Sequence, residues 1–271
     1  MVRRISEVLL TLLVLASLAG CTSVAVSGRK QLNIISDSEM MAMSFQQYDE
    51  VLKESELSSN TDQVAMVQRV GANIQGAVER YFKQINRSND LQGYEWEFNL
   101  IESEEANAWA MPGGKVAFYT GILPICKDEI GVAVVMGHEV AHAIAEHGAE
   151  RMSQALLVQM GGMALSSAVE NEPEQTQALW MGAFGFGAQV GVMLPFSRTM
   201  ESEADHLGLI FMAMAGYDPN AAVSFWERMA VLKGGAAPSG ILMFLSTHPS
   251  DQKRIANIKE KLPQALKYYQ P

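Results

Sequence analysis

The sequence contains little cysteine. Its 271 residues include two cysteines, Cys21 and Cys126, and Cys21 directly follows an apolar N-terminal stretch. If Cys21 is chemically modified, as argued below, no disulfide can form within the chain. Stability must then come mainly from packing, and we expect Cys126 to be a small, buried, apolar residue.

Basic residues are also scarce. Twenty lysines and arginines stand against 30 aspartates and glutamates, the formal net charge is −10, and the basic residues form no run or stripe. Binding to nucleic acid needs a basic surface, so we expect no nucleic-acid partner. The apolar fraction of 48% allows a sizeable core, in one domain or in two small ones.

After its N-terminus, the chain lacks an apolar run long enough to span a bilayer. Residues 155–170 and 178–194 come nearest, but each is rich in glycine and shorter than the roughly 20 residues that a spanning helix needs. The polar stretch ENEPEQTQ separates them. We therefore expect a helical hairpin or lid packed on the domain, with contact to a membrane as the alternative.

The first 20 residues are typical of a secretory signal peptide. Two arginines, at positions 3 and 4, precede an apolar stretch over residues 5–19, and LAGC follows at residues 18–21. This motif resembles the lipobox of bacterial lipoproteins. The resemblance implies cleavage before Cys21 and acylation of its sulfur, which would anchor the protein without a spanning helix.

The same resemblance predicts how the chain begins and where it resides. Residues 1–20 would be the signal peptide and residues 21–36 a lipidated tether. The protein would be lipid-anchored on the periplasmic side of a bacterial cell envelope, with the outer membrane as the default because Thr22 follows the cysteine. A plain signal peptide with a chance cysteine is the alternative.

Residues 37–271 are expected to form one domain of the α+β class, mostly helical, with a small antiparallel sheet. Apolar residues at mixed three- and four-residue spacing predict helices, and the alternation in YEWEFNLI predicts a strand. A Pro-Gly-Gly turn at 112–114 predicts a hairpin. The expected helices span 37–58, 61–86, 128–147 (with Gly148 as its C-cap), 197–215, 219–233 and 250–268, and the expected strands include 94–101 and 115–119.

The segment MGHEVAHAIAEHG, residues 136–148, carries the strongest chemical signal. In a helix, His138 and His142 differ by about 40° around the axis, so their rings can hold one metal ion. Glu139 lies about 100° round and can reach a water on that ion. A buried pair of histidines without a ligand would be costly. The alternative is chance, because HExxH occurs in many unrelated proteins.

A catalytic zinc site needs a third protein ligand and an open position. In RTMESEADHLG, residues 198–208, Glu201 and Asp205 lie four apart on one helix face. Glu201 can ligate the metal, and Asp205 can accept a hydrogen bond from the free ring nitrogen of a ligand histidine. Glu203, rotated about 200° from Glu201, is a lesser candidate. A solvated acidic face is the alternative.

HEVAH followed by ESEAD resembles the gluzincin family of the CAAX prenyl protease and HtpX. With the lipobox, the chain resembles the periplasmic lipoprotein branch of that family, the BepA and LoiP type. The segments NAWAMPGG and STHPSDQKRI extend the resemblance over residues 37–265. It implies a zincin-like metalloprotease domain with one zinc ion per chain, held by His138, His142 and Glu201, and with Glu139 as the catalytic base.

The resemblance also implies a role for His248. In that family the histidine of the later His-Pro segment sits over the zinc, where it stabilises the transition state or occupies the open position and holds the enzyme inactive. A surface histidine before a proline is the alternative. Arg254 either faces the site and contacts substrate or neutralises a helix surface.

We therefore expect a zinc metalloendopeptidase in which Glu139 activates a zinc-bound water for attack on the peptide carbonyl. The substrate would add as a strand to Asn107, Ala108, Trp109, Ala110 and Met111, although this segment can also be an ordinary hairpin. Backbone pairing gives little sequence selectivity, so unfolded or misassembled envelope proteins are the expected substrates.

Two other functions are compatible with these residues. The first is an envelope assembly factor or chaperone with a self-inhibited or vestigial protease site. The second is a lipoprotein with a purely structural zinc, which predicts a closed coordination sphere and no hydrolysis of an unfolded protein.

Overall fold

The structure is a computed structural model, and it describes residues 21–25, 27–189, 194–234, 244, 245, 248 and 252–270. The predicted signal peptide, residues 1–20, lies outside the described residues. The chain separates into two compact units. The first comprises the described residues up to Asp37 together with Glu146–Thr199, and the second comprises Ser38–Ala145 together with Met200–Pro271.

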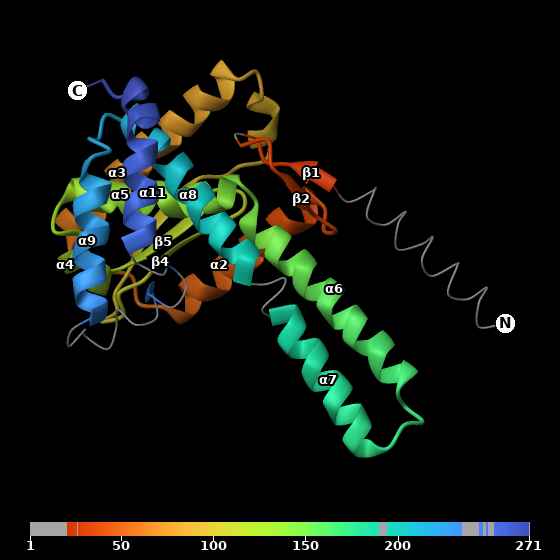
Figure 1. Cartoon of the computed structure of the whole chain (residues 1–271). Coiled ribbons are helices and arrows are strands. Elements are labelled where there is room, and N and C mark those ends of the chain that lie inside the picture. Colours follow the sequence, from red (N-terminus) through yellow and green to blue (C-terminus); the bar gives the residue numbers. More distant parts are fainter. Residues whose placement is uncertain are drawn as a thin grey trace. The chain divides into compact units, whose positions relative to one another are not determined.

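The described chain is mostly helical with small sheets, as predicted (Figure 1). The longer helices are α2 (Asp37–Glu54), α3 (Thr61–Gln84), α5 (Glu129–Ile144), α6 (His147–Ala168), α7 (Glu174–Ala188), α8 (Leu194–Met214), α9 (Ala221–Gly234) and α11 (Gln252–Ala265), with a short α4 (Leu123–Cys126). The strands are β1 (Cys21–Ser23), β2 (Lys30–Leu32), β3 (Glu97–Ile101), β4 (Ala108–Met111) and β5 (Lys115–Tyr119).

The sheet of the second unit is mixed, whereas we predicted an antiparallel one. Its strand order is β3-β5-β4; β3 pairs parallel with β5, and β4 pairs antiparallel with β5. The predicted turn joins β4 to β5, and Gly113 and Gly114 both adopt positive φ there. The parallel pair arises because the chain passes from β3 to the far edge before it returns through the centre as β5. This strand order leaves β4 at an edge.

Helix α5 forms the interior of the second unit. Almost all of its residues are buried, because it is apolar on every side except at its histidines and glutamates. Asp128 caps its start by accepting a hydrogen bond from the backbone N–H of Gly131 (2.9 Å). The helix packs against α3, β4 and α9. Polar side chains of α5 are therefore held in a rigid, largely apolar surrounding.

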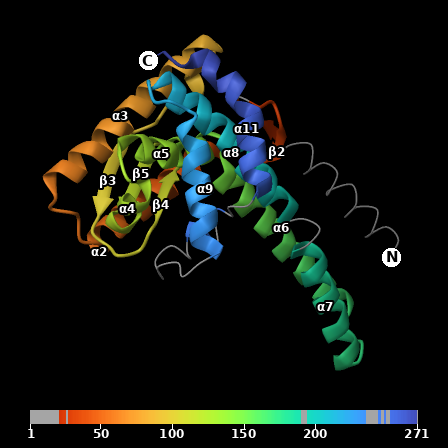
Figure 2. The ribbon, with the colours of Figure 1, turned by 60° about the vertical axis from the view of Figure 1, so that its left-hand side comes forward.

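Helices α9 and α11 pack against each other in the second unit (Figure 2). α9 contributes Trp226, which is fully buried, and also contacts α5. α11 buries Ile255 and Ile258 and contributes the buried Arg254. This packing brings side chains from two late segments of the chain towards the histidines of α5.

The junction between α5 and α6 differs from the prediction. We expected one helix to His147 with Gly148 as its cap, but α5 ends at Ile144 and Gly148 lies inside α6. Glu146 adopts a left-handed conformation (φ 57°), which interrupts the helix. Side-chain amides of Gln31 and Asn33 donate hydrogen bonds to the Glu146 carboxylate, and these contacts hold the break.

The segment predicted as a tether, 21–36, contains a small hairpin in the first unit. Its strands β1 and β2 pair antiparallel. Arg29 makes two bonds, of 2.9 and 2.7 Å, with the buried carboxylate of Glu150 on α6. The hydroxyl of Ser153 accepts from the backbone N–H of Ile34 (2.9 Å). The hairpin is thus fastened to the first turns of α6.

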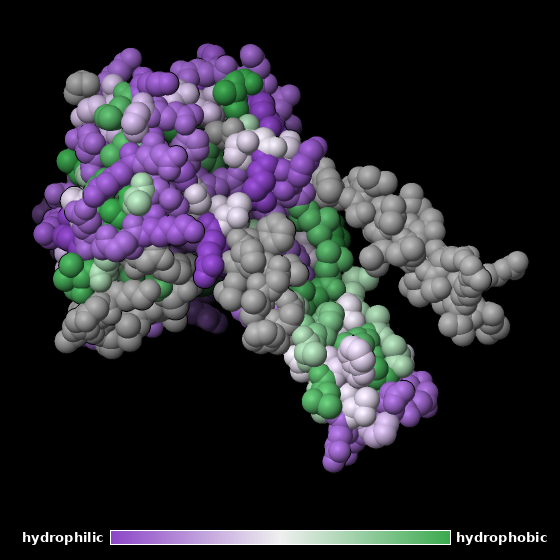
Figure 3. Space-filling view, in the orientation of Figure 1, coloured by the Kyte–Doolittle hydropathy of each residue, from purple (hydrophilic) through white to green (hydrophobic). Residues whose placement is uncertain are grey.

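The predicted helical hairpin is formed by α6 and α7 in the first unit, and Phe184 of α7 packs on Gly161 of α6. Both arms lack charged residues over most of their length, and Figure 3 shows hydrophobic residues along them. Met160 is 59% exposed and Leu179 is 75% exposed. No helix among the described residues combines the length and the apolar character needed to cross a bilayer.

Candidate metal centre

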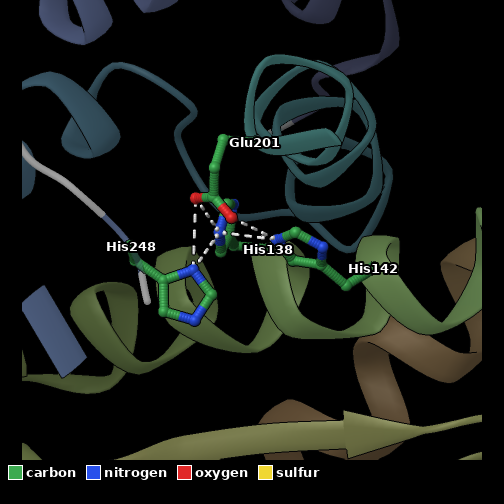
Figure 4. Close-up of side chains that lie close together, drawn as sticks. All are labelled: His138, His142, Glu201 and His248. Atoms are coloured by element: carbon green, nitrogen blue, oxygen red, sulfur yellow. Dashed lines mark hydrogen bonds and ion pairs between the residues drawn. The ribbon is translucent and has the colours of Figure 1, made fainter. Parts of the chain in front are cut away.

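Two histidines of α5 form one side of the site. His138 and His142 lie one turn apart, and their Nε2 atoms are 3.2 Å from each other. The rings meet edge to face, with centroids 4.7 Å apart, and His138 is buried. As Figure 4 shows, each ring presents a nitrogen to the same space.

A carboxylate from α8 forms the next side. Glu201 Oε2 lies 3.4 Å from His138 Nε2, and Glu201 Oε1 lies 3.1 Å from His142 Nε2. Helix α8 can come this close because a glycine, Gly208, faces the backbone of α5. The structure therefore brings together three residues that the sequence predicted as metal ligands, from two helices far apart in the chain.

His248 is the fourth member of the group. Its Nδ1 lies 3.1 Å from His138 Nε2 and 3.2 Å from Glu201 Oε2. Its other ring nitrogen, Nε2, lies 3.4 Å from Glu139 Oε1. The ring packs on Phe244, with centroids 4.7 Å apart. His248 thus contacts both the ligand group and the predicted base.

These four residues fit one zinc ion in chemistry and in spacing. Imidazole nitrogen and carboxylate oxygen are usual zinc ligands, and on a tetrahedral zinc with bonds of about 2.0–2.1 Å they would lie roughly 3.3 Å apart. The separations given above run from 3.1 to 3.4 Å. Glu201 Oε1 is buried, and its near polar neighbour is His142 Nε2 at 3.1 Å, so the metal-ligating atoms face one another.

Asp205 lies behind His138, on the side away from the ligand group. Its Oδ1 is 3.1 Å from His138 Nδ1. A proton held on Nδ1 leaves the Nε2 lone pair directed at the site. Burial raises the pKa of Asp205, but the Arg254 guanidinium and the hydrogen bond with His138 outweigh burial and lower the pKa to about 2. The carboxylate is therefore charged at neutral pH.

The pKa values of two ligand residues are shifted in opposite directions. For His138, burial and the charge of Arg254 lower the pKa, but hydrogen bonds with Asp205 and Glu201 outweigh them and raise it to about 9. For Glu201, burial raises the pKa, but hydrogen bonds with three histidines outweigh it and hold the pKa well below its usual range. Both shifts have the same cause, since the contacts between the histidines and the carboxylates favour the charged form of each partner.

Glu139 lies next to the ligand group on α5. It is 4% exposed, and burial raises the pKa of its carboxyl although the charges of His248 and His138 oppose the shift. The neighbour of its Oε1 is His248 Nε2, at 3.4 Å. A carboxylate whose pKa lies nearer to neutrality can take up a proton and return it during a reaction.

The predicted substrate strand, residues 107–111, largely coincides with β4. One edge of β4 pairs with β5, and among the described residues no strand pairs with the other edge. Trp109 packs edge-on against Tyr48, with ring centroids 5.7 Å apart, which fixes the inner face of the strand. A free strand edge is what addition of a peptide strand requires.

Arg254 faces the metal centre, which is one of the two placements that the sequence left open. Its guanidinium is buried and donates to both oxygens of Asp205 (2.7 and 3.0 Å), while Nη1 lies 3.2 Å from Glu201 Oε2. It also lies over the ring of Trp226, a residue that sequence analysis missed. A contact of Arg254 with substrate remains a prediction of the sequence.

Other sequence predictions concern residues outside this group. Glu203 is buried but does not join the ligand group, and its charge acts on His206 and Lys261 instead. Cys126 is buried as predicted, and burial raises the pKa of its thiol to about 12, so it is not a reactive thiol. Cys21 lies in β1, and its lipidation remains a prediction of the sequence.

The chain matches known proteins over this site. The sequence model described as Peptidase family M48 matches residues 69–262. The mitochondrial metalloendopeptidase OMA1 of Schizosaccharomyces pombe is 39% identical over 188 residues, which cover 69% of this chain and 53% of the relative. The human mitochondrial metalloendopeptidase OMA1 is 27% identical over 247 residues, which cover 89% of this chain and 46% of the relative.

A bacterial relative is also similar. The beta-barrel assembly-enhancing protease of Escherichia coli is 29% identical over 172 residues, which cover 62% of this chain and 34% of the relative. The chain spans about half the length of the OMA1 relatives given above. The predicted resemblance to a metallopeptidase family is confirmed, whereas the narrower resemblance to a periplasmic lipoprotein branch is not.

The comparisons contradict the predicted location in a bacterial cell envelope with a periplasmic lipid anchor. Several similar relatives, from yeasts, a plant and mammals, are mitochondrial by name. The prediction depended on a basic start, an apolar run and the four-residue motif LAGC. Such short N-terminal patterns direct targeting and are not constrained by the fold, so they do not follow from the metal centre.

Proposed function

Because the chain belongs to peptidase family M48, we propose that it is a zinc-dependent endopeptidase with its active site at His138, His142, Glu201 and Glu139. One observation carries the proposal. Ring nitrogens and a carboxylate oxygen from two separate helices converge at the spacing of zinc ligands, and the buried carboxyl of Glu139 lies beside them.

The residues divide the chemistry among them. His138, His142 and Glu201 would hold a zinc ion, which would supply Lewis-acid chemistry by making a water molecule more acidic and polarising the peptide carbonyl. Glu139 Oε1 accepts the proton of that water and passes it to the leaving amine. Burial favours this role, because it raises the pKa of the Glu139 carboxyl and so makes its carboxylate a stronger proton acceptor.

His248 controls access in this proposal. Its Nδ1 lies as close to His138 Nε2 and Glu201 Oε2 as the ligands lie to each other, and its Nε2 faces Glu139. In this arrangement His248 would complete the ligand group around a bound ion, and it also lies beside the base. We infer that His248 holds the site closed and must move away before a peptide can react.

Substrates would bind along β4 as an added strand. The unpaired edge of β4 offers backbone N–H and C=O groups, and these recognise any extended chain. Folded proteins do not present such a segment, so we propose unfolded or misassembled polypeptides as the substrate class. Any preference for a substrate sequence would come from the side chains of residues 107–111 that face away from the core.

The test is cleavage of casein, an unstructured protein, by the zinc-loaded full chain. We expect Glu139→Gln to abolish cleavage while zinc stays bound, because the substitution removes the base and keeps the ligands. Glu174→Gln, at an exposed position of α7, is the matched control and should leave cleavage unchanged. Undiminished cleavage by Glu139→Gln would exclude Glu139 as the base and with it this proposal.

A second function, binding without cleavage, has one observation in its favour. His248 completes the ligand group, so the arrangement also suits a protease that is held off while the protein acts in assembly. A binding assay with casein distinguishes the two functions. An assembly factor binds casein and releases it intact even when zinc is bound, whereas the proposed peptidase cleaves it.

A further inference from the structure

Arg254 contacts two carboxylates of the metal centre, those of Asp205 and Glu201. Its Nε and Nη2 donate to the two oxygens of Asp205, at 3.0 and 2.7 Å. One edge of the guanidinium therefore binds both carboxylate oxygens. Its third nitrogen, Nη1, lies 3.2 Å from Glu201 Oε2. The side chain is 7% exposed, so water does not compete for these bonds.

The contacts of Arg254 are shared with the ligands. Asp205 Oδ1 contacts both Arg254 Nη2 and His138 Nδ1, at 2.7 and 3.1 Å. Arg254 Nη2 also lies 3.2 Å from His138 Nε2. The guanidinium therefore contacts Glu201 and His138 directly, and it also reaches His138 through Asp205.

Trp226 fixes the plane of this guanidinium. The Cζ atom of Arg254 lies 3.3 Å from the centroid of the Trp226 ring, as in a stacked cation–π pair. The ring itself is 1% exposed and stacks on Phe244. A planar fork on a rigid ring cannot rotate freely, so both carboxylates are held in defined directions. A lysine amine has no plane and cannot make this arrangement.

Arg254 also balances the charge of the loaded site. Glu139, Glu201 and Asp205 are three buried carboxylates in one small volume. The two positive charges of zinc together with that of Arg254 offset the three negative charges. Buried charges are tolerated when they are paired in this way, so the arginine lets three acidic groups stay in place around one ion.

We propose that Arg254 is a positioning residue of the metal centre, whose planar guanidinium holds Asp205 and Glu201 in the directions that let His138 and Glu201 ligate zinc. The inference rests on the proposed function, because it concerns the same site. It assigns Arg254 no contact with substrate. A plain stabilising ion pair is the competing explanation, and it would affect unfolding without changing the metal.

The experiment measures zinc affinity and the cobalt spectrum of the full chain. Arg254→Lys keeps the charge and removes the fork, and Asp205→Asn removes the carboxylate through which the fork reaches His138. Lys253→Arg, one position earlier and exposed, is the matched control. Zinc alone is titrated against a chromophoric chelator, and Co²⁺ alone is added to the metal-free protein to record the visible absorption of the ligand set.

We expect Arg254→Lys to weaken zinc binding by about 10- to 100-fold, as loss of an orienting partner does. Its cobalt bands should move or broaden, because the ligand geometry is less well fixed. Asp205→Asn should weaken zinc binding to a similar extent. The loss of zinc affinity in the double variant should be much smaller than the product of the two single fold-changes. Lys253→Arg should match the wild type.

If Arg254→Lys had wild-type zinc affinity and an unchanged cobalt spectrum, the inference would be overturned. It would also be overturned if the double variant lost zinc affinity by the full product of the two single fold-changes. If Arg254→Lys does not fold, Asp205→Asn still decides, because wild-type affinity and spectrum in that variant contradict the proposed route to His138. Failure of the proposed function is distinguishable, since the wild-type chain itself would then bind no zinc or would not cleave casein.

Discussion

Gly137 of α5 and Gly208 of α8 face each other where the two helices cross. A Cβ atom on Gly137 would lie 2.9 Å from the carbonyl oxygen of Gly208, and a Cβ atom on Gly208 would lie 2.9 Å from the backbone nitrogen of His138. Backbones approach this closely only where both residues lack a side chain. Because Glu201 lies about two turns before Gly208, this contact sets the distance between the two halves of the metal centre.

The first prediction concerns this crossing. Gly208→Ala should push α8 away from α5, because the new methyl group meets backbone atoms that cannot rotate aside. We expect zinc affinity to fall by at least about tenfold, and overpacking to lower the free energy of unfolding by about 1–3 kcal/mol. Chelator competition and chemical denaturation measure the two effects.

Gly182→Ala in α7 is the control for that substitution. A Cβ atom there meets nothing within 4 Å, and alanine favours a helix over glycine by up to about 1 kcal/mol. This variant should be as stable as the wild type or more stable, with the same zinc affinity. Tight zinc binding by Gly208→Ala would mean that the glycine contact does not control the ligand spacing.

The second prediction concerns His248. If its Nδ1 closes the site, His248→Ala should increase the rate of casein cleavage and leave one zinc bound, because His138, His142 and Glu201 remain. His206→Ala, which removes a histidine of α8 outside the ligand group, is the control and should not change the rate. A large loss of cleavage with zinc still bound would instead assign His248 a direct part in the reaction.

The third prediction is a pH dependence of stability in the metal-free protein. The pKa of Asp205 is lowered from 3.8 to about 2 in the folded state, so unfolding takes up a proton between these values. The stabilisation is complete above the unfolded pKa of 3.8 and is lost as the pH falls through about 2. It amounts to roughly 2 kcal/mol.

Comparison of the wild type with Asp205→Asn isolates this contribution. Denaturant unfolding of both metal-free proteins, at several pH values from about 6 to about 2, gives the difference in unfolding free energy. The advantage of the wild type should be largest at the highest pH and should shrink with acidification. A difference that does not vary with pH would show that the Asp205 carboxylate gains no stabilisation from its charged partners.

The fourth prediction concerns the first unit. Glu150→Gln removes the charge that faces Arg29 in a pair whose glutamate side chain is 1% exposed. We expect faster hydrogen exchange in β1 and β2 and a loss of roughly 2 kcal/mol of stability, because the arginine keeps its charge without a full partner. Glu170→Gln, at an exposed position after α6, should change neither. Unchanged exchange in β2 would mean that the Arg29 contact does not fasten the hairpin.

Much of the metal centre could be predicted because it depends on local helix geometry. Spacing of four residues places His138 beside His142 on α5, and Glu201 beside Asp205 on α8, whatever the rest of the chain does. The expectation that the histidine pair lies next to the acidic pair came from the resemblance to a known family. The glycine contact that permits the approach has no signal in the sequence beyond two small residues.

The features that sequence analysis missed depend on contacts between distant segments. The contact between Arg254 and Trp226 forms because α9 and α11 pack together. Neither segment carries a sequence pattern that predicts it. The break at Glu146 has no glycine or proline, and hydrogen bonds from Gln31 and Asn33 hold it. The parallel pairing of β3 with β5 likewise depends on the path of the chain between strands. The alternation of apolar residues within a strand does not predict that path.

The central claim is that His138, His142 and Glu201 hold one metal ion. A crystal structure of the zinc-loaded full chain, with anomalous scattering recorded at the zinc edge, tests it most directly. We expect one anomalous peak per chain, within about 2.2 Å of Nε2 of both histidines and of a Glu201 carboxylate oxygen. No peak there, or a peak that Glu201 does not contact, would contradict it.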